Sequence, residues 1–155
     1  MSRILFICMG NICRSPTAEG VARALAERQG MAHLHEFDSA GTHDYHLGEP
    51  PDRRTRATAQ QRGYDLSKLR ARQVAMDDFE CFDLILAMDR ANLDWLQARC
   101  PEPQRHKLRL FLEYAENHPE EEVPDPYYGG EQGFEHVLDL VEDAARGLLM
   151  QSGSR

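Results

Sequence analysis

The sequence has no long apolar run. A membrane-spanning helix needs about 20 consecutive apolar residues, and no stretch of this chain approaches that length. The segment Met1–Ile7 contains a short apolar stretch that leads directly into polar residues. A signal peptide would need a longer apolar region and a small-residue cleavage site. We therefore expect a cytoplasmic protein that has no membrane partner.

Positive charge is also scarce. Of 155 residues, 26 are acidic and 18 are Lys or Arg, which gives a formal net charge of -8. Binding to nucleic acid or to an anionic membrane depends on a basic surface, so we expect neither as a partner. An anionic substrate would have to be bound by local dipoles and a few arginines.

Cysteine is sparse, with residues only at positions 8, 13, 81 and 100. This number is too small for a disulfide scaffold in a chain of this length. Cys81 and Cys100 stand alone and are best interpreted as small buried apolar side chains. Cys8 and Cys13 have a spacing suited to half of a zinc site, but no second Cys/His pair completes it. We therefore expect no metal.

Internal repeats and low-complexity linkers are missing too, and hydrophobic residues make up 41% of the chain. These features predict a single globular domain over residues 1–155. Strand-like and helix-like segments alternate, which predicts an α/β protein whose parallel sheet has helices on both faces. The expected strands are Arg3–Cys8, Leu34–Ser39, Phe82–Met88 and Leu108–Phe111. The expected helices run from Ser15 to Gly30, over Asp52–Arg62, from the cap residue Asp89 to Ala98 and from Phe134 to Leu148.

The loop after the first strand is the expected ligand site, because parallel sheets bind ligands beyond the carboxyl ends of their strands. Ser15 is predicted to cap the following helix, with Pro16 in the first helical position and Glu19 in the first turn. Successive backbone N–H groups and the helix N-terminus would then form a nest for an anion.

Individual residues of this loop suit a phosphate group. Gly10 allows close approach of the backbone, and Asn11 tolerates left-handed dihedral angles. Arg14 has a planar fork that binds two phosphate oxygens. Next to such a site the Cys8 thiol loses its proton more readily and becomes a nucleophile, to which the Ser15 hydroxyl could donate a hydrogen bond.

The spacing of Cys8 and Arg14 is weak evidence by itself, because chance would produce it in roughly a third of shuffled sequences. The competing interpretation is a buried cysteine at a strand end beside a solvated arginine. The preceding strand, the following Ser-Pro helix start and the Gly and Asn inside the loop favour the phosphate site.

The segment Cys8-Met-Gly-Asn-Ile-Cys-Arg-Ser15 resembles the signature of the low-molecular-weight protein tyrosine phosphatases. Further similar segments follow in the family's order at Asp38-Ser-Ala-Gly41, Ala71-Arg-Gln73, Phe82-Asp-Leu-Ile-Leu-Ala-Met-Asp89 and Asp125-Pro-Tyr-Tyr128. The resemblance implies a three-layer sandwich with strand order 2-1-3-4. It also implies cofactor-free hydrolysis of phosphotyrosine and aryl phosphate monoesters through a cysteinyl phosphate. The expected partner is a phosphotyrosine-containing protein, with a tyrosine kinase as one candidate.

The resemblance also assigns roles outside the nucleophile and Arg14. Asp125, which lies between two prolines, becomes the general acid and base, a choice that chemistry alone could not make among 26 acidic residues. The expected substrate walls are Tyr45, His46, Tyr127 and Tyr128, and the expected phosphate loop also includes Met9, Gly10, Asn11, Ile12, Cys13 and Ser15. We interpret the run Glu120–Glu122 before the acid as a solvated surface cluster.

One departure from the family concerns support of Asn11. Many relatives have a histidine just before the Ala-Arg-Gln segment, whereas this chain has Lys68-Leu-Arg70. Ser39 is expected to supply more of the support. Cys13 has two interpretations, either loop packing or protection of oxidised Cys8 through a disulfide.

Four alternatives remain at the level of sequence. An arsenate reductase of the same fold would need two further cysteines close together, and Cys81 and Cys100 fit this poorly. Arginine-phosphate specificity goes with a threonine where Ile12 stands. A non-catalytic phosphopeptide-binding module would not need Cys8 and Asp125 together with Arg14, and a zinc-dependent hydrolase lacks a complete ligand set.

Overall fold

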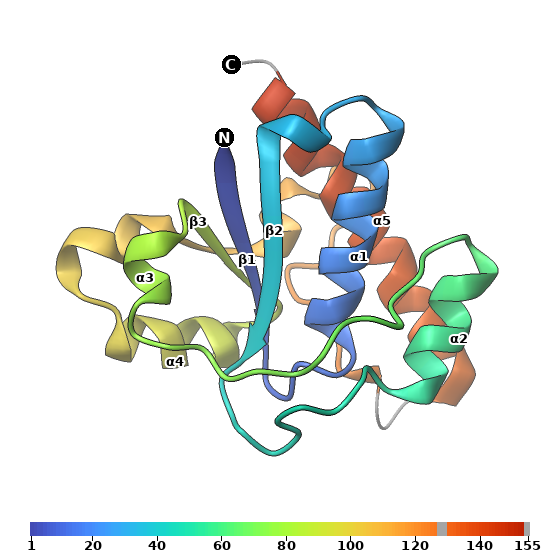
Figure 1. Ribbon diagram of the computed structural model, residues 1–155, viewed down its shortest axis with the longest axis horizontal. Helices are drawn as coiled ribbons and strands as arrows, with labels where there is room; N and C mark the ends of the chain where they lie inside the picture. The colour runs from blue at the N-terminus through green and yellow to red at the C-terminus, as the bar shows by residue number, and fades with distance from the viewer. Residues whose placement is uncertain (127–129, 154–155) are drawn as a thin grey trace.

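The computed structural model describes residues 1–126 and 130–153. Four strands form one parallel sheet in the order β2-β1-β3-β4. Their bounds are Ser2–Cys8 for β1, His35–Gly41 for β2, Leu84–Ala87 for β3 and Leu108–Leu110 for β4. Figure 1 shows β1 and β2 side by side. The predicted α/β class and strand order are confirmed.

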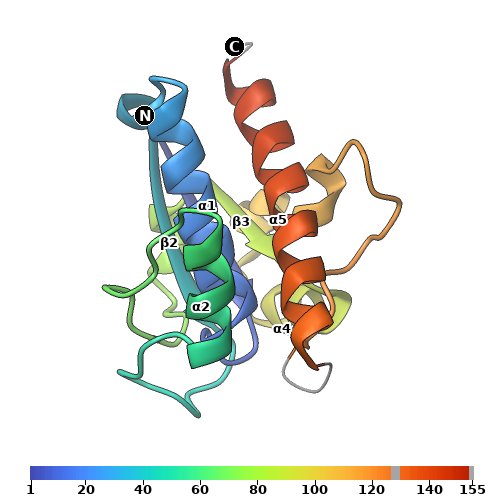
Figure 2. The ribbon, with the colours of Figure 1, turned by 90° about the vertical axis from the view of Figure 1, so that its right-hand side faces the viewer.

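Helices cover the sheet on both faces (Figures 1 and 2). One side carries α1 (Arg14–Arg28) and α5 (Gly130–Gly153), and α2 (Arg53–Gln61) packs against α5. The other side carries α3 (Asp78–Cys81) and α4 (Arg90–Arg99). Short 3-10 turns connect these elements at η1 (Ala32–Leu34), η2 (Glu102–Lys107) and η3 (Phe111–Tyr114). The arrangement has three layers, as expected.

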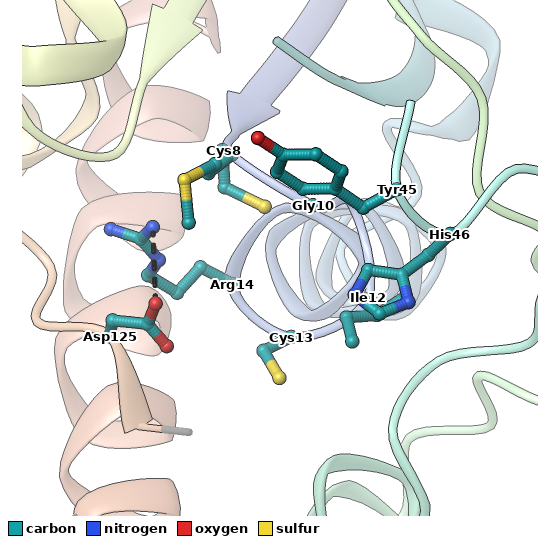
Figure 3. A pocket seen from close by; sticks show the side chains of 9 residues that line it. Cys8, Gly10, Ile12, Cys13, Arg14, Tyr45, His46 and Asp125 are labelled. Carbon is teal, nitrogen blue, oxygen red and sulfur yellow. Dashed lines mark ion pairs between the residues drawn. The ribbon is translucent and has the colours of Figure 1, made fainter. Parts of the chain in front are cut away.

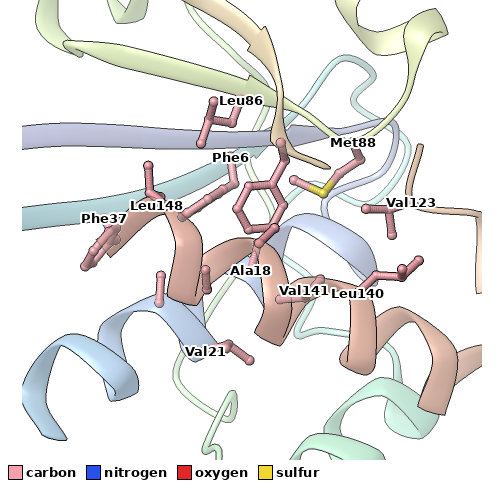
Figure 4. Close-up of a cluster of buried hydrophobic side chains, with 14 of the residues drawn as sticks. Phe6, Ala18, Val21, Phe37, Leu86, Met88, Val123, Leu140, Val141 and Leu148 are labelled. Carbon is pink, nitrogen blue, oxygen red and sulfur yellow. The ribbon is translucent and has the colours of Figure 1, made fainter. Parts of the chain in front are cut away.

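The two faces of β1 explain why the sheet is buried on both sides. Successive side chains of a strand point to opposite faces. Ile4 and Phe6 join the larger apolar cluster against α1 and α5, whereas Leu5 and Ile7 join the cluster under α3 and α4. Figure 4 shows Phe6 between the sheet and the helices of the larger cluster. An uninterrupted apolar strand is what a two-sided core requires.

Some predicted boundaries were wrong at helix starts. Cys13, not Ser15, is the N-cap of α1 and makes no side-chain capping bond, and no acidic residue lies in the first turn. The reason is local: the Ser15 hydroxyl binds the side chains of Cys8 and Asn11 instead of capping the helix. Asp89 caps α4, as predicted, and Asp52, expected as the first residue of its helix, is the cap of α2.

Helix α5 begins at Gly130, four residues before the expected start at Phe134. The periodicity of apolar side chains marks only the buried part of a helix, so it misses a first turn that carries none. Strand β3 is shorter than expected because Phe82 and Met88, both buried, lie outside the paired segment. In the part of the chain that the structure describes, no helix is long and apolar enough to cross a membrane.

The topology fixes the place of the Cys8–Ser15 loop. Strand β1 pairs with β2 on one side and with β3 on the other. The connections leaving β1 and β3 therefore diverge at the carboxyl edge of the sheet, where ligands of such folds bind. The loop leaves β1 at this edge and enters α1.

Candidate active site

A cavity of about 290 Å³ opens at the carboxyl end of β1. Its lining consists of Cys8, Met9, Gly10, Ile12, Cys13, Arg14, Tyr45, His46 and Asp125. All of these were predicted from the sequence, and they come from three separated segments of the chain. Figure 3 shows Arg14 and Asp125 on one side of the loop, with Tyr45 and His46 on the other. The structure therefore brings most of the expected residues to one place.

Cys8 ends β1 and is 2% exposed. Its Sγ lies 3.0 Å from the Ser15 hydroxyl oxygen and accepts a hydrogen bond from the backbone N–H of Asn11 at 3.2 Å. With the Ser15 hydroxyl as donor, both contacts suit an anionic sulfur. The Ser15 hydroxyl thus contacts Cys8 and Asn11 of the loop and does not cap the helix.

Asn11 shapes the loop by its backbone and its side chain. Its φ of 57° is the only positive φ outside glycine among the described residues, and asparagine adopts this region more readily than most residues. Its amide donates to the hydroxyls of Ser15 at 2.8 Å and Ser39 at 3.0 Å, and its side-chain oxygen accepts from the backbone N–H of Arg72 at 3.0 Å. Every hydrogen-bonding group of the side chain is therefore engaged.

The bracing of Asn11 continues into the protein interior. Ser39 donates its hydroxyl to Glu19 at 2.7 Å, and Glu19 binds Arg23 at 2.7 Å. Burial raises the pKa of the Glu19 carboxyl, and its bonds to Ser39 and Arg23 offset part of that rise. Leu69, in the segment where the family resemblance led us to expect a histidine, packs against the larger apolar cluster. The support that histidine would give comes here from Ser39, Glu19 and a backbone N–H.

Arg14 is 4% exposed and connects three parts of the site. Its Nη1 donates to Asp89 at 2.6 Å and to the carbonyl of Val123 at 3.1 Å, while Nη2 lies 4.0 Å from Asp125 (Figure 3). Burial alone would lower the pKa of the guanidinium, but Cys8, Asp89 and Asp125 outweigh it and raise that pKa. Arg14 is therefore a fixed positive charge beside the sulfur.

The residues expected to form the cavity walls differ in how firmly they are held. Tyr45 is 67% exposed and stacks on His43 with ring centroids 5.1 Å apart. The ring of His46 binds Glu49 at 2.7 Å and closely approaches Gly10, where an added Cβ would lie 3.1 Å from it. Tyr127 and Tyr128 lie outside the described residues.

The other cysteines are all free thiols. Cys13 lines the cavity and is buried, and burial raises the pKa of its thiol to about 12. Cys81 ends α3 and is exposed, so the prediction that it is buried is wrong, whereas Cys100 follows α4 and is buried, as predicted. Within the described residues neither of these two lines the cavity, which leaves the sequence argument against an arsenate reductase in place.

Sequence reasoning missed several residues of the site. Asp89 was predicted only as a helix cap, yet its second carboxylate oxygen binds Arg14. Glu19 and Val123 were also not assigned to the site. A carboxylate 75 residues from its arginine leaves no local pattern in the sequence, and Val123 acts through its backbone.

Among the residues the structure describes, no group of three or more His, Cys, Asp or Glu side chains could hold a metal ion.

The comparisons with known proteins point in one direction. The family model described as low molecular weight phosphotyrosine protein phosphatase matches residues 3–154. A low molecular weight protein-tyrosine-phosphatase of Streptomyces coelicolor is 47% identical over 150 residues, which cover 95% of this chain and 91% of that protein. The low molecular weight phosphotyrosine protein phosphatase of Homo sapiens is 37% identical over 148 residues, covering 94% and 92%.

A solved structure agrees with these sequence matches. The crystal structure of a protein tyrosine phosphatase from Entamoeba histolytica, with Hepes in its active site, superposes with a TM-score of 0.96. Its sequence is 40% identical, and the match covers 99% of this chain and 98% of that one. The chain belongs to the low molecular weight phosphotyrosine protein phosphatase family.

Proposed function

We propose that this protein hydrolyses phosphotyrosine and related aryl phosphate monoesters, with Cys8 as nucleophile and Asp125 as general acid and base. The observation that carries the proposal is the position of the Cys8 sulfur. It lies between two hydrogen-bond donors of its own loop, in one cavity with Arg14 and Asp125. Membership of the family supports the same reaction.

In the first step, the Cys8 thiolate attacks phosphorus and the bond from phosphorus to the phenolic oxygen breaks. The backbone N–H groups of the loop and the Arg14 guanidinium bind the three remaining phosphoryl oxygens, where negative charge accumulates. Asp125 gives its proton to the departing phenolate. The enzyme then carries a cysteinyl phosphate, and the alcohol leaves neutral.

In the second step, water attacks the cysteinyl phosphate. Asp125, now a carboxylate, accepts the proton of this water while the sulfur–phosphorus bond breaks. Inorganic phosphate leaves and the thiolate returns. The same carboxyl group can serve both steps because the proton lost in the first is regained in the second.

Family membership and the wall residues define the proposed substrate. Tyr45 offers an exposed aromatic face at the cavity mouth, next to His46, and a flat phenyl ring packs well against such a face. We propose phosphotyrosine-containing proteins as substrates, with a tyrosine kinase among the candidates, and neither nucleic acid nor membrane as a partner. We also propose a single catalytic domain over residues 1–155 that acts in the cytoplasm.

The test is hydrolysis of p-nitrophenyl phosphate and of phosphotyrosine, phosphoserine and phosphoarginine peptides in the presence of EDTA. We expect turnover that survives chelation and favours phosphotyrosine, disappears in Cys8→Ser and falls about 100-fold or more in Asp125→Asn. Binding without turnover would instead indicate a phosphopeptide-binding module, and loss on chelation a metal enzyme.

A further inference from the structure

The acid segment, defined as residues 121–126, carries Asp125 and is held at the junction of β3 and α4. Val123 is fully buried, and its N–H donates to the carbonyl of Met88 at 2.8 Å. The carbonyl of Val123 accepts from Arg14 at 3.1 Å. The backbone two residues before Asp125 is therefore fixed on one side by the sheet and on the other by the phosphate-binding arginine.

A carboxylate forms the next attachment. Glu122 accepts a hydrogen bond at 2.8 Å from the backbone N–H of Arg90, the first residue of α4. The first N–H groups of a helix have no partner within it, and the helix N-terminus carries partial positive charge. The adjacent Glu121 forms an ion pair with the Arg90 side chain. Glu121 and Glu122 are exposed, as expected for a surface cluster, and both also bind Arg90.

These contacts form a continuous attachment from helix to acid. Met88, Asp89 and Arg90 are consecutive in the chain, and they bind Val123, Arg14 and Glu122 respectively. Pro124 and Pro126 then restrict the backbone on either side of Asp125. A displacement at Glu122 would therefore be transmitted to the acid rather than absorbed by a flexible linker.

We propose that Glu122, bound to the first N–H of α4, is a positioning residue that holds Asp125 in place for proton transfer. The proposal rests on the proposed function, because it concerns the acid of that reaction. The ion pair of Arg90 and Glu121 has a minor part, since the two side chains are 58% and 70% exposed and such pairs contribute little. The hydrogen bond of Glu122 to the helix carries the effect.

The test compares aryl phosphates whose leaving groups differ in basicity. A phenolate that is a poor leaving group needs the proton of Asp125, whereas a dinitrophenolate leaves without it. We expect Glu122→Ala to lower kcat/KM for phenyl phosphate about tenfold. A general acid accelerates such a reaction by a factor of about 10²–10⁴, so this loss is a part of the contribution of Asp125. The value for 2,4-dinitrophenyl phosphate should change less than twofold. Glu122→Gln keeps an acceptor oxygen and should recover most of the loss.

A second pair of variants addresses the donor. Proline is accepted at the first position of a helix, and Asp89 has the extended conformation, φ −146° and ψ 173°, that a residue before proline adopts. Arg90→Pro removes the N–H and should reproduce the loss in Glu122→Ala. Arg90→Ala keeps the N–H and loses only the pair with Glu121, so its kcat/KM for phenyl phosphate should fall much less.

Glu120→Ala is the matched charge control. Glu120 belongs to the same acidic run, but its partner is His136, at 3.6 Å, rather than α4. Its removal should leave both kcat/KM values unchanged. Inhibition by inorganic phosphate should be equal in all variants, because the Cys8–Ser15 loop and Arg14 are intact.

The outcomes separate this proposal from the assignment of the acid. Asp125→Asn is the reference: if it shows no leaving-group-dependent loss, the assignment of Asp125 fails. If Asp125→Asn shows that loss and Glu122→Ala does not, Glu122 has no positioning role. An equal loss for both substrates, or weaker phosphate inhibition, would mean general disruption and would also overturn the proposal. If Arg90→Pro does not fold, the substitutions at the exposed Glu122 still test its positioning role.

Discussion

The Ser39 hydroxyl accepts a hydrogen bond of 3.0 Å from the side-chain amide of Asn11. Through its own proton the same hydroxyl binds Glu19 at 2.7 Å. The phosphate loop is thereby connected to a buried carboxylate on α1, which in turn binds Arg23. Because Asn11 also donates its backbone N–H to the Cys8 sulfur, this series of bonds reaches the proposed nucleophile.

The first prediction concerns Glu19. Glu19→Ala leaves the buried Ser39 hydroxyl without its acceptor, which should cost about 1–3 kcal/mol of stability. It should also lower kcat, since Asn11 loses a fixed partner. Glu19→Gln keeps an acceptor oxygen and should retain most activity. Steady-state kinetics and thermal unfolding of both variants measure these effects; equal kcat in Glu19→Ala and the wild type would rule out support through Ser39.

The pH dependence of stability gives a second readout for Glu19. Burial raises the pKa of its carboxyl in the folded protein, partly offset by Ser39 and Arg23. The folded state therefore binds this proton more tightly than the unfolded chain, whose value is about 4.3. The contribution of Glu19 to stability is greatest below that value and declines as pH rises through the folded pKa. The wild type should show this decline relative to Glu19→Gln in denaturant unfolding at a series of pH values.

Asp89 gives the second prediction, because its two oxygens have separate functions. One caps α4 through Asn92 N–H at 2.8 Å, and the other binds Arg14 at 2.6 Å. Asparagine is as good a cap as aspartate but does not provide the charge for Arg14. Asp89→Asn should therefore weaken inhibition by inorganic phosphate and lower kcat/KM about tenfold, while its unfolding midpoint stays close to that of the wild type.

Asp89→Ala is the comparison that separates the two functions. It removes the cap as well, so it should show the same kinetic loss together with a stability loss of about 1 kcal/mol. If Asp89→Asn bound phosphate normally, the pair with Arg14 would be structural only.

The sequence predicted the sheet, the Cys8–Ser15 loop and the cap of α4, because each has a local pattern. Apolar runs mark strands, and Asp before an amphipathic segment marks a helix start. The partners of Arg14 and of Ser39 were not predictable in this way, since Asp89 and Glu19 reach them only through the packing of β3 and β2 beside β1. The assignment of Asp125 as the proposed acid came from family resemblance alone, and neither spacing nor composition distinguishes it from other acidic residues.

The third prediction concerns Gly41 at the end of β2. An added Cβ there would lie 2.7 Å from the Met9 carbonyl oxygen and 3.1 Å from that of His43. Both are backbone atoms that the segment after β2 fixes, since His43 N–H donates to the Met9 carbonyl at 3.0 Å. Gly41→Ala should thus displace the phosphate loop, lowering both stability and kcat/KM.

Gly10→Ala is the matched control for Gly41. Its new Cβ would lie 3.1 Å from the His46 ring, a side chain that can move. We expect a smaller effect on kcat/KM, and little on the unfolding midpoint. If the two alanine variants lost activity and stability equally, close backbone contact would not explain the glycine at 41.

The fourth prediction concerns His118 and Asp143, which hold the chain after η3 against α5. Asp143 is 5% exposed and accepts from the backbone N–H groups of Glu116 and Asn117 and from the His118 ring at 2.7 Å. Burial alone would raise the pKa of the Asp143 carboxyl, but these bonds outweigh it and lower that pKa. The hydrogen bond to Asp143 raises the pKa of His118, with burial opposing it.

The pKa shifts of His118 and Asp143 set the upper and lower ends of the pH range in which the pair stabilises the fold. The raised His118 pKa stabilises the fold below the unfolded value of about 6.5, and that contribution is lost as pH rises through the folded pKa. The lowered pKa of Asp143 stabilises the folded protein above the unfolded value of about 3.9, and that contribution is lost as pH falls through the folded pKa. The pair should therefore contribute most at about pH 4–6.

Denaturant unfolding of His118→Gln and Asp143→Asn across this range measures the pair directly. His118→Gln should lose stability relative to the wild type at pH 5 and approach it at alkaline pH. Asp143→Asn should lose more stability than His118→Gln at every pH above about 4. The expected loss is about 2 kcal/mol, or roughly 4–8 °C in unfolding midpoint, because two backbone N–H groups lose a charged acceptor. A His118→Gln deficit that did not shrink on going from pH 5 to alkaline pH would show that the ring acts by packing and not by its charge.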